Sequence, residues 1–257
     1  MSETVLLSYE KNIATITLNR PEQLNAMDHN LLTQLREKVK EVHESDAQIV
    51  VLTGAGKAFS AGGDIKTMLQ SADQEGFTEI MNMIKQMMLT YYTLPKITIS
   101  AVNGAAAGLG FSLALASDYI IASPNSKLAM NFIGIGLIPD GGGHFFLEQR
   151  LGPVRAKQVI WEGKMMTASE ALEAGLVDAV TAEDFTDSIR QYTGKLQAAP
   201  LKALIETKSI YAEYYKPKLA DFLDKETKGQ SKMRMTRDHQ EGIQAFLEKR
   251  KPNFKGN

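Results

Sequence analysis

Two short segments rich in small residues could together hold one reacting oxygen. The first runs from Lys57 to Lys66 with the sequence Lys-Ala-Phe-Ser-Ala-Gly-Gly-Asp-Ile-Lys, and the second from Asn103 to Gly110 with the sequence Asn-Gly-Ala-Ala-Ala-Gly-Leu-Gly. Each follows a predicted strand, and small side chains leave backbone N–H groups open to a ligand. Two such donors that converge from rigid elements stabilise negative charge on a carbonyl oxygen, and a helix N-terminus adds a favourable dipole. The pattern alone also fits two tight turns in which glycine supplies a positive φ.

Other chemistries lack their characteristic residues. Gly54-Ala-Gly56-Lys57 lacks the earlier glycine and the following Ser or Thr of a phosphate-binding loop, and Gly108-Leu-Gly110 lacks the third glycine of a dinucleotide fingerprint. The four histidines (His29, His43, His144 and His239) are scattered without the i, i+4 pairing typical of a metal site. We therefore expect neither a metal nor a redox cofactor.

Composition limits the class of partner and the compartment. The 257 residues carry 29 Lys plus Arg against 30 Asp plus Glu, a net charge of -1, which disfavours nucleic acid and anionic membrane as partners. No cysteine is present, which excludes disulfides and thiolate catalysis. The N-terminus has no signal-peptide pattern, and no apolar run reaches the roughly 20 residues of a membrane span. We expect a cytoplasmic protein with no membrane partner.

The elements that must position these segments alternate between strand and helix. Alternating or continuous apolar patterns predict strands at 13–18, 49–53, 97–102 and 119–122, and helical periodicity predicts helices at 31–42, 77–92, 111–116 and 168–174. The continuous run at 49–53 is typical of a parallel strand covered on both faces. After Thr181 the chain is charged and helical. This predicts an α/β core over residues 1–195 and a helical C-terminal module over 196–257.

Several large side chains have no chemical pattern of their own. Met81, Met83, Met87 and Met88 are expected in the core or as an adaptable apolar lining, and Trp161 is expected to be buried in packing.

The order of motifs resembles the enoyl-CoA hydratase/isomerase (crotonase) superfamily. The motifs are Asn19-Arg-Pro-Glu-Gln-Leu-Asn-Ala26, Ala58 to Ile65, Ala101 to Asp118, Ala168 to Val177, and Glu241 to Lys251, which together cover nearly the whole chain. The resemblance implies a spiral of repeated ββα units with a C-terminal helical trimerisation region. It also implies an acyl-CoA thioester substrate, and assembly as a homotrimer or a dimer of trimers. Within the superfamily, the motifs are most similar to the phenylacetate-pathway isomerase and the Δ3,Δ2-enoyl-CoA isomerases.

The resemblance assigns roles to individual residues. The backbone N–H groups of Gly63 and Leu109 would form the oxyanion hole for the thioester carbonyl. The residues that would hold coenzyme A, as part of the substrate, are Lys57, Leu24, Ala26, Ala61, Asp64, Phe246 and Lys249. The last two complete the pocket in some members from a neighbouring subunit.

The resemblance also indicates which reaction to expect. Typical hydratases use two glutamates, and this chain has Ser112 and Phe132 at those positions. Asp140, in Ile-Pro-Asp-Gly-Gly, is by pattern alone a turn residue. However, isomerases of the superfamily carry a lone carboxylate at the matching position. We expect an apolar wall containing Phe132 and Ile133 to raise the pKa of Asp140 toward a range useful for reversible proton transfer.

The sequence therefore favours an isomerase that shifts a double bond in an unsaturated acyl-CoA, with Asp140 as base and Gly63 and Leu109 as oxyanion donors. Two alternatives stay open: an enoyl-CoA hydratase with atypical proton-transfer residues, and a non-catalytic acyl-CoA-binding protein.

Overall fold

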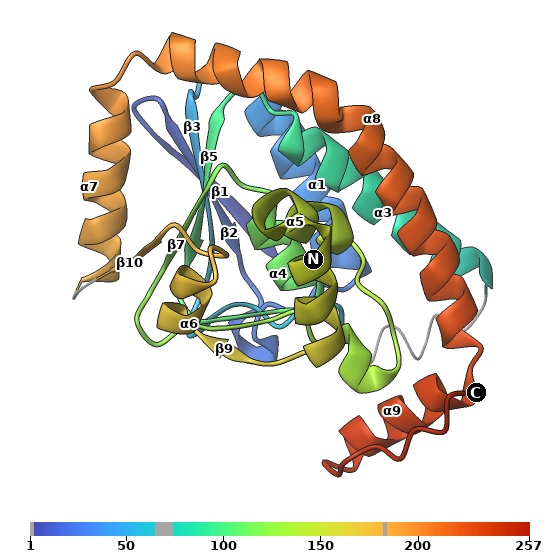
Figure 1. Ribbon diagram of the computed structural model, residues 1–257. Coiled ribbons are helices and arrows are strands. Elements are labelled where there is room, and N and C mark those ends of the chain that lie inside the picture. Colours follow the sequence, from blue (N-terminus) through green and yellow to red (C-terminus); the bar gives the residue numbers. More distant parts are fainter. Residues whose placement is uncertain (1–2, 65–73, 182–183) are drawn as a thin grey trace.

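The computed structural model of the chain describes residues 3–64, 74–181 and 184–257 (Figure 1). Ile65 and Lys66, the end of the first small-residue segment, lie outside the described residues.

A six-stranded sheet forms the centre of the fold. Its spatial order is β1 (Val5–Glu10), β2 (Ile13–Leu18), β3 (Ile49–Gly54), β5 (Ile97–Val102), β7 (Tyr119–Ala122) and β10 (Ala179–Val180). The first two strands pair antiparallel, and the rest are parallel. The strands predicted at 13–18, 97–102 and 119–122 have the observed bounds, whereas β1 and the short β10 were not predicted.

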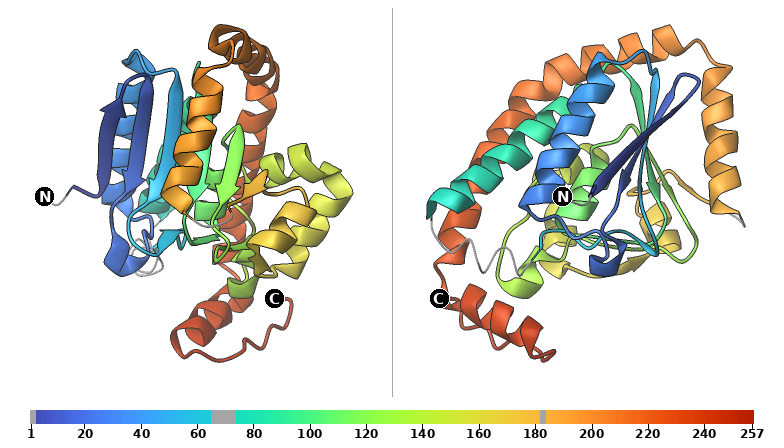
Figure 2. Two further views of the ribbon diagram at one scale, coloured as in Figure 1. Left: turned by 90° about the vertical axis from the view of Figure 1, so that its left-hand side faces the viewer. Right: turned by 180° about the vertical axis from the view of Figure 1, so that it is seen from behind.

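Both faces of this sheet are covered, as the continuous apolar run predicts. Along β3, Ile49 and Val51 belong to one buried cluster, while Val50 and Leu52 belong to the other. On one face lie α1 (His29–Glu44) and α3 (Gln74–Tyr92), and on the opposite face lies α7 (Phe185–Gln197), as Figure 2 shows. The alternation follows from the period of two in a strand, which sends neighbouring side chains to opposite faces.

A second sheet lies below the first. It has the order β4 (Ala58–Ser60), β6 (Ala105–Ala107), β8 (Lys127–Ala129) and β9 (Met166–Thr167). Strands β3, β5 and β7 of the first sheet each lead to one strand of the second and then to helix: α3, α4 (Leu109–Leu115) and, after the short η2 (Asn131–Ile135), α5 (Gly143–Glu162). This succession confirms the expected repeat of ββα units. Two smaller elements, η1 (Pro21–Gln23) and α6 (Ala168–Glu173), complete the core.

The C-terminal helices are α8 (Leu201–Arg234) and α9 (Arg237–Leu247). Figure 1 shows α8 running along the outside of the helical layer and α9 folded below it. Leu219 and Leu223 of α8 are buried in the main core, so part of this region packs inside its own chain. The expected boundary at residue 195 lies within α7, which ends at Gln197.

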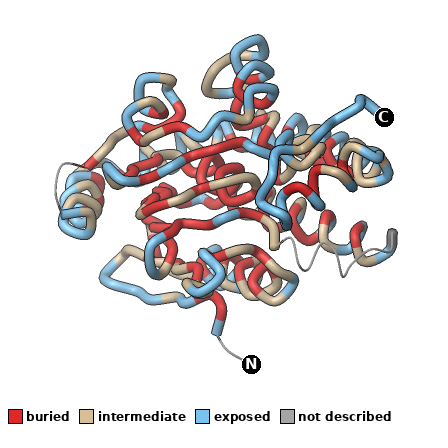
Figure 3. Tube along the Cα trace, turned by 90° about the horizontal axis from the view of Figure 1, so that it is seen from below, coloured by how far each residue is buried: buried red, intermediate tan, exposed pale blue. Residues whose placement is uncertain are grey.

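Burial follows the layers, with buried strands inside and an exposed C-terminal tail, as Figure 3 shows. The four methionines of α3 are buried, as predicted. The prediction for Trp161 was wrong: its side chain is 65% exposed, and Lys157 Nζ lies 5.7 Å from the centre of its ring. Trp161 follows the break at Gly152 and Pro153 within α5, and Val154 beyond that break is exposed as well. No helix among the described residues is long and apolar enough to cross a membrane.

Candidate active site

Parallel pairing of β4 with β6 brings the two small-residue segments together. Ala58 is paired with Ala105, and the chain leaves both strands on the same side. Gly62, with φ +94°, lies where a Cβ atom would be 2.6 Å from the carbonyl oxygen of Ala107 and 3.3 Å from the nitrogen of Leu109. A side chain at position 62 would therefore force the segments apart. Position 62 therefore needs glycine for two reasons, the positive φ and the close approach of the two backbones.

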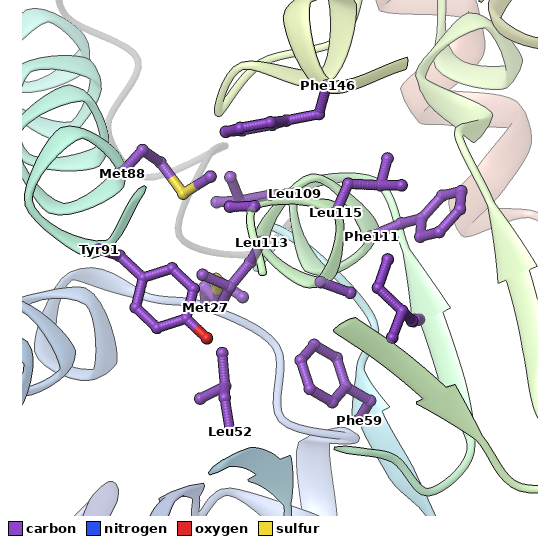
Figure 4. Close-up of a cluster of buried hydrophobic side chains, with 14 of the residues drawn as sticks. Met27, Leu52, Phe59, Met88, Tyr91, Leu109, Phe111, Leu113, Leu115 and Phe146 are labelled. Carbon is purple, nitrogen blue, oxygen red and sulfur yellow. The ribbon is translucent and has the colours of Figure 1, made fainter. Parts of the chain in front are cut away.

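The two predicted oxyanion donors line one cavity of about 60 Å³. Gly63 is held by an isolated parallel bridge to Met27, with the Asp64 N–H donating to the Met27 carbonyl at 3.1 Å. Leu109 is the first residue of α4, where a backbone N–H has no acceptor within the helix. The Leu109 side chain points into the core among Met27, Met88 and Phe146 (Figure 4), which anchors the start of α4.

Asp140 lines the same cavity. Its Oδ1 atom is shielded from solvent and has no hydrogen-bond partner within residues 3–64, 74–181 and 184–257, while Oδ2 accepts from Gln230 Nε2 at 3.3 Å. The next residue, Gly141, packs so closely on Leu109 that a Cβ atom would lie 2.5 Å from Leu109 Cδ1. The structure thus brings together the carboxylate and both predicted oxyanion donors from three separate segments of the chain.

The pKa of Asp140 is raised to about 8, first by burial of the carboxyl and second by the negative charge of Glu226. The predicted direction is confirmed, but the predicted wall is wrong. Among the described residues the apolar lining comes instead from one stripe of α3 together with residues of α1 and its approach: Phe77, Ile80, Met81, Ile84, Met27 and Leu32. The spacing of the α3 residues (i, i+3, i+4, i+7) places them on one helix face. Ile133 is exposed at 38%, and the Phe132 ring lies beside Gly108.

Ser112, at one of the two positions where hydratases carry glutamate, is buried and donates from Oγ to the carbonyl oxygen of Asp140 at 2.7 Å. A serine here fixes the backbone of the loop and supplies no carboxylate. Neither Ser112 nor Phe132 offers a group that exchanges protons near neutral pH.

Four of the predicted coenzyme A residues lie where the loop after β2 meets the loop after β4: Leu24, Ala26, Ala61 and Asp64. Ala61 donates its N–H to the Leu24 carbonyl at 2.9 Å, and the Arg20 guanidinium donates to the Ala26 carbonyl and the Asp64 carboxylate. Buried Asn25, which the sequence reasoning missed, links the same loops by donating to the carbonyls of Ala55 and Ala58. Asn25 has a positive φ of 56°, a conformation for which Asn is favoured, and this was the available signal.

The other three predicted coenzyme A residues are exposed. Lys57 lies in the turn between β3 and β4, close to these loops in the chain. Phe246 is near the end of α9, 57% exposed, and Lys249 follows the helix. Helix α9 packs on η2, where His239 Nδ1 lies 2.8 Å from the Ile135 carbonyl oxygen. The coenzyme A roles of all seven residues stay predictions.

The sequence reasoning also missed Glu226, Gln230 and Arg234. All three come from α8, and Gln230 and Arg234 line the cavity beside Asp140. Glu226 is only 2% exposed, although it stands in a helix with many charged residues. Its burial has no signal in the sequence, because neighbouring lysines and aspartates give the whole segment a solvated appearance.

A sequence profile described as enoyl-CoA hydratase/isomerase matches residues 8–257. The chain belongs to this family. YhaR of Bacillus subtilis, which bears the same family name, is 48% identical over 242 residues, covering 94% of this chain and 95% of the relative. The 1,2-epoxyphenylacetyl-CoA isomerase of Escherichia coli is 35% identical over the full length of both chains. A crystal structure of an enoyl-CoA hydratase from Mycobacterium avium subsp. paratuberculosis superposes with a TM-score of 0.88 at 30% identity, covering 98% of this chain and 99% of the other.

Membership of the enoyl-CoA hydratase/isomerase family confirms the superfamily and fold predicted from the motifs. The relatives carry the names of both isomerases and hydratases. The choice between the two reactions therefore depends on the residues of this cavity.

Proposed function

We propose that the protein is an acyl-CoA isomerase that shifts a double bond in an unsaturated acyl-CoA. The observation that carries the proposal is the position of Asp140. The Asp140 carboxylate, whose Oδ1 is shielded and has no hydrogen-bond partner among the described residues, shares a cavity with two backbone donors, whereas the Asp28 and Asp64 carboxylates of the same cavity are paired with Arg20. A 1,3-proton shift needs one base, whereas typical hydration uses two.

The proposed reaction balances without any added reactant. With a 3-enoyl thioester, the Asp140 carboxylate takes a proton from C2, and the electron pair of the broken C–H bond delocalises over the C3–C4 double bond and the thioester carbonyl. The N–H groups of Gly63 and Leu109 stabilise the resulting dienolate oxygen. Asp140 then returns the proton to C4, which leaves the double bond between C2 and C3. A pKa of about 8 suits this cycle, because the carboxyl must both accept and release the proton.

The apolar cavity supports the same assignment. The stripe of α3 that faces Asp140 consists of apolar side chains that offer a water molecule no hydrogen bond, and the other polar residues of the lining (Asp28, His29, Asp64, Gln230 and Arg234) come from other elements. Exclusion of water favours return of the proton to carbon over addition of hydroxide to C3. Hydration by atypical residues is the second candidate, favoured by the 30% identity to a crystal structure named as a hydratase.

Two substrates separate these reactions. Incubation with a 3-enoyl-CoA should increase the absorbance of the conjugated thioester at unchanged mass, and crotonyl-CoA should keep its conjugation. Loss of conjugation from crotonyl-CoA with a gain of one water, and no conversion of the 3-enoyl-CoA, would establish hydration instead. Binding of acyl-CoA with neither reaction, and no exchange of substrate protons in deuterated water, would make the protein a non-catalytic acyl-CoA-binding protein.

We also propose assembly as a homotrimer or a dimer of trimers. Support comes from apolar side chains that one chain leaves uncovered on the C-terminal helices: Ile210, Tyr211, Tyr214, Met235, Phe246 and Leu247. Tyr214 is the second most exposed of them at 75%. Light scattering after size exclusion measures the mass directly, and a monomer at micromolar concentration would contradict the proposal.

A further inference from the structure

Helix α8 packs against the loop that carries Asp140. Glu226, Gly229 and Gln230 are spaced i, i+3 and i+4 and therefore share one face of the helix. Gly229 lies so close to the loop that a Cβ atom would be 2.3 Å from Ile138 Cδ1. On the other side of the contact, Gln230 Nε2 donates to the Ile138 carbonyl oxygen at 2.5 Å.

The strongest contacts between α8 and this loop are made by Glu226. Its carboxylate accepts from the Gly142 N–H at 2.7 Å and the His144 N–H at 3.1 Å, and His144 Nδ1 lies 2.8 Å from it. Because a carboxylate only accepts, Nδ1 carries the proton of that imidazole. Three N–H donors thus satisfy the ionised form of Glu226 at a depth where an unpaired carboxylate would be costly.

These contacts restrain a turn that is intrinsically loose. Gly141 and Gly142 follow Asp140 with φ of +63° and +81°, a conformation that glycine enters at little cost and also leaves easily. The Gly142 N–H bond to Glu226 fixes the turn from one side, and the Ser112 hydroxyl bond to the Asp140 carbonyl fixes it from the other.

The charges around Asp140 come from several elements, and most are compensated. Asp28 at the start of α1 and Asp64 after β4 both pair with Arg20, at 3.2 and 3.1 Å. His29 of α1 is exposed, and Arg234 of α8 has its guanidinium 4.3 Å from the centre of the Phe77 ring. His144 of α5 contacts Glu226. Glu226 is the carboxylate whose charge acts on Asp140.

Resting on the proposed isomerase function, we propose that Glu226 is a positioning residue for Asp140. It holds the turn of Gly141 and Gly142 so that the Asp140 carboxylate faces the cavity, and its negative charge helps Asp140 to hold the proton during transfer. Glu226 does not line the cavity and touches no reacting atom.

Two substitutions separate the positioning from the charge. Glu226→Gln keeps an acceptor for the Gly142 N–H but removes the charge, so the pH midpoint of kcat/KM should fall by about 1 unit or more. Glu226→Asp keeps the charge but withdraws the carboxylate from the turn. For this variant kcat should fall about 10-fold at unchanged KM, with the midpoint retained.

Glu148→Gln is the matched control. Glu148 also links α5 to α8, through Lys218 at 2.7 Å, but it does not contact the turn. Both kcat and the midpoint should stay at the wild-type values in this variant.

A second measurement makes the test independent of catalysis. Titration of Asp140 by ¹³C NMR of labelled aspartate, assigned with Asp140→Asn, should show the same downward shift in Glu226→Gln. This readout works even if the protein isomerises nothing, so failure of the proposed function and failure of the Glu226 role are distinguishable. An unchanged Asp140 midpoint in folded Glu226→Gln would overturn the proposal. If that variant does not fold, unchanged kcat in Glu226→Asp would overturn it.

Discussion

Replacing Asp140 with Asn should abolish isomerisation while leaving acyl-CoA binding intact. The amide is nearly isosteric and can still accept from Gln230, but it cannot take and return a proton. Loss of a positioned general base lowers a rate by about 10²- to 10⁴-fold. Four of the predicted coenzyme A residues lie on the loops around Asn25, three lie elsewhere on the surface, and none of the predicted contacts uses the Asp140 side chain.

The size of the defect should depend on pH. With the pKa of Asp140 at about 8, roughly a tenth of the wild-type carboxyl is ionised at pH 7 and about nine tenths at pH 9. Wild-type kcat/KM should therefore rise about 10-fold over this range, while the residual activity of Asp140→Asn stays flat. The ratio between the two proteins should be largest at pH 9.

The stability of the wild-type protein should decrease as the pH rises, in contrast to its activity. The folded pKa of about 8 exceeds the ordinary value of 3.8, so the unfolded chain loses its proton first as the pH rises. Wild-type stability is full below pH 4, decreases as the pH rises toward 8, and levels off above it. The loss is at most about 6 kcal/mol. Because Asn does not ionise, Asp140→Asn should have a higher Tm relative to wild type at pH 9 than at pH 4.

Three measurements check this reasoning: stopped-flow absorbance of the conjugated thioester from pH 6 to 9.5, calorimetric binding of a saturated acyl-CoA, and thermal unfolding at both pH extremes. Unchanged turnover at pH 9 would eliminate Asp140 as the base.

Three further perturbations test the scaffold of the site. Gly62→Ala should lower kcat more than 10-fold and destabilise the protein by about 1–3 kcal/mol, since its Cβ would lie 2.6 Å from the Ala107 carbonyl oxygen at a φ of +94°; wild-type activity and Tm would refute the close approach of the two loops. Lys57→Ala should raise KM for acyl-CoA several-fold at unchanged kcat, because an exposed cation at its predicted place near the coenzyme A phosphates would contribute uniform binding; an equal KM would contradict the predicted role of Lys57. Deleting residues 200–257 should give an aggregating or unfolded product, because it removes Leu219 and Leu223 from the core; a soluble, active monomer by light scattering would contradict this.

Local pattern was sufficient to predict the elements of the core. Strand β2 and strand β5 have the predicted bounds, because a period of two or a short apolar run between turn residues has few other folded solutions. The Asp28 side chain caps α1 by accepting from the Leu31 N–H, a role for which Asp directly before an apolar helical pattern is favoured. The prediction that Trp161 is buried was wrong because periodicity shows which residues share a helix face, and not whether anything covers that face.

The motifs, read by resemblance, identified the family and assigned roles to Asp140, Gly63 and Leu109 in three separate segments of the chain. Their meeting in one cavity depends on the pairing of β4 with β6 and on the packing of Gly141 against Leu109, which are contacts between residues distant in sequence. The raised pKa of Asp140 arises from burial and from Glu226, a residue of the C-terminal helix that no local pattern links to the turn. Residue types and their order thus determine which groups are available for chemistry, whereas burial and the field of distant charges exist only once α8 has packed against the core.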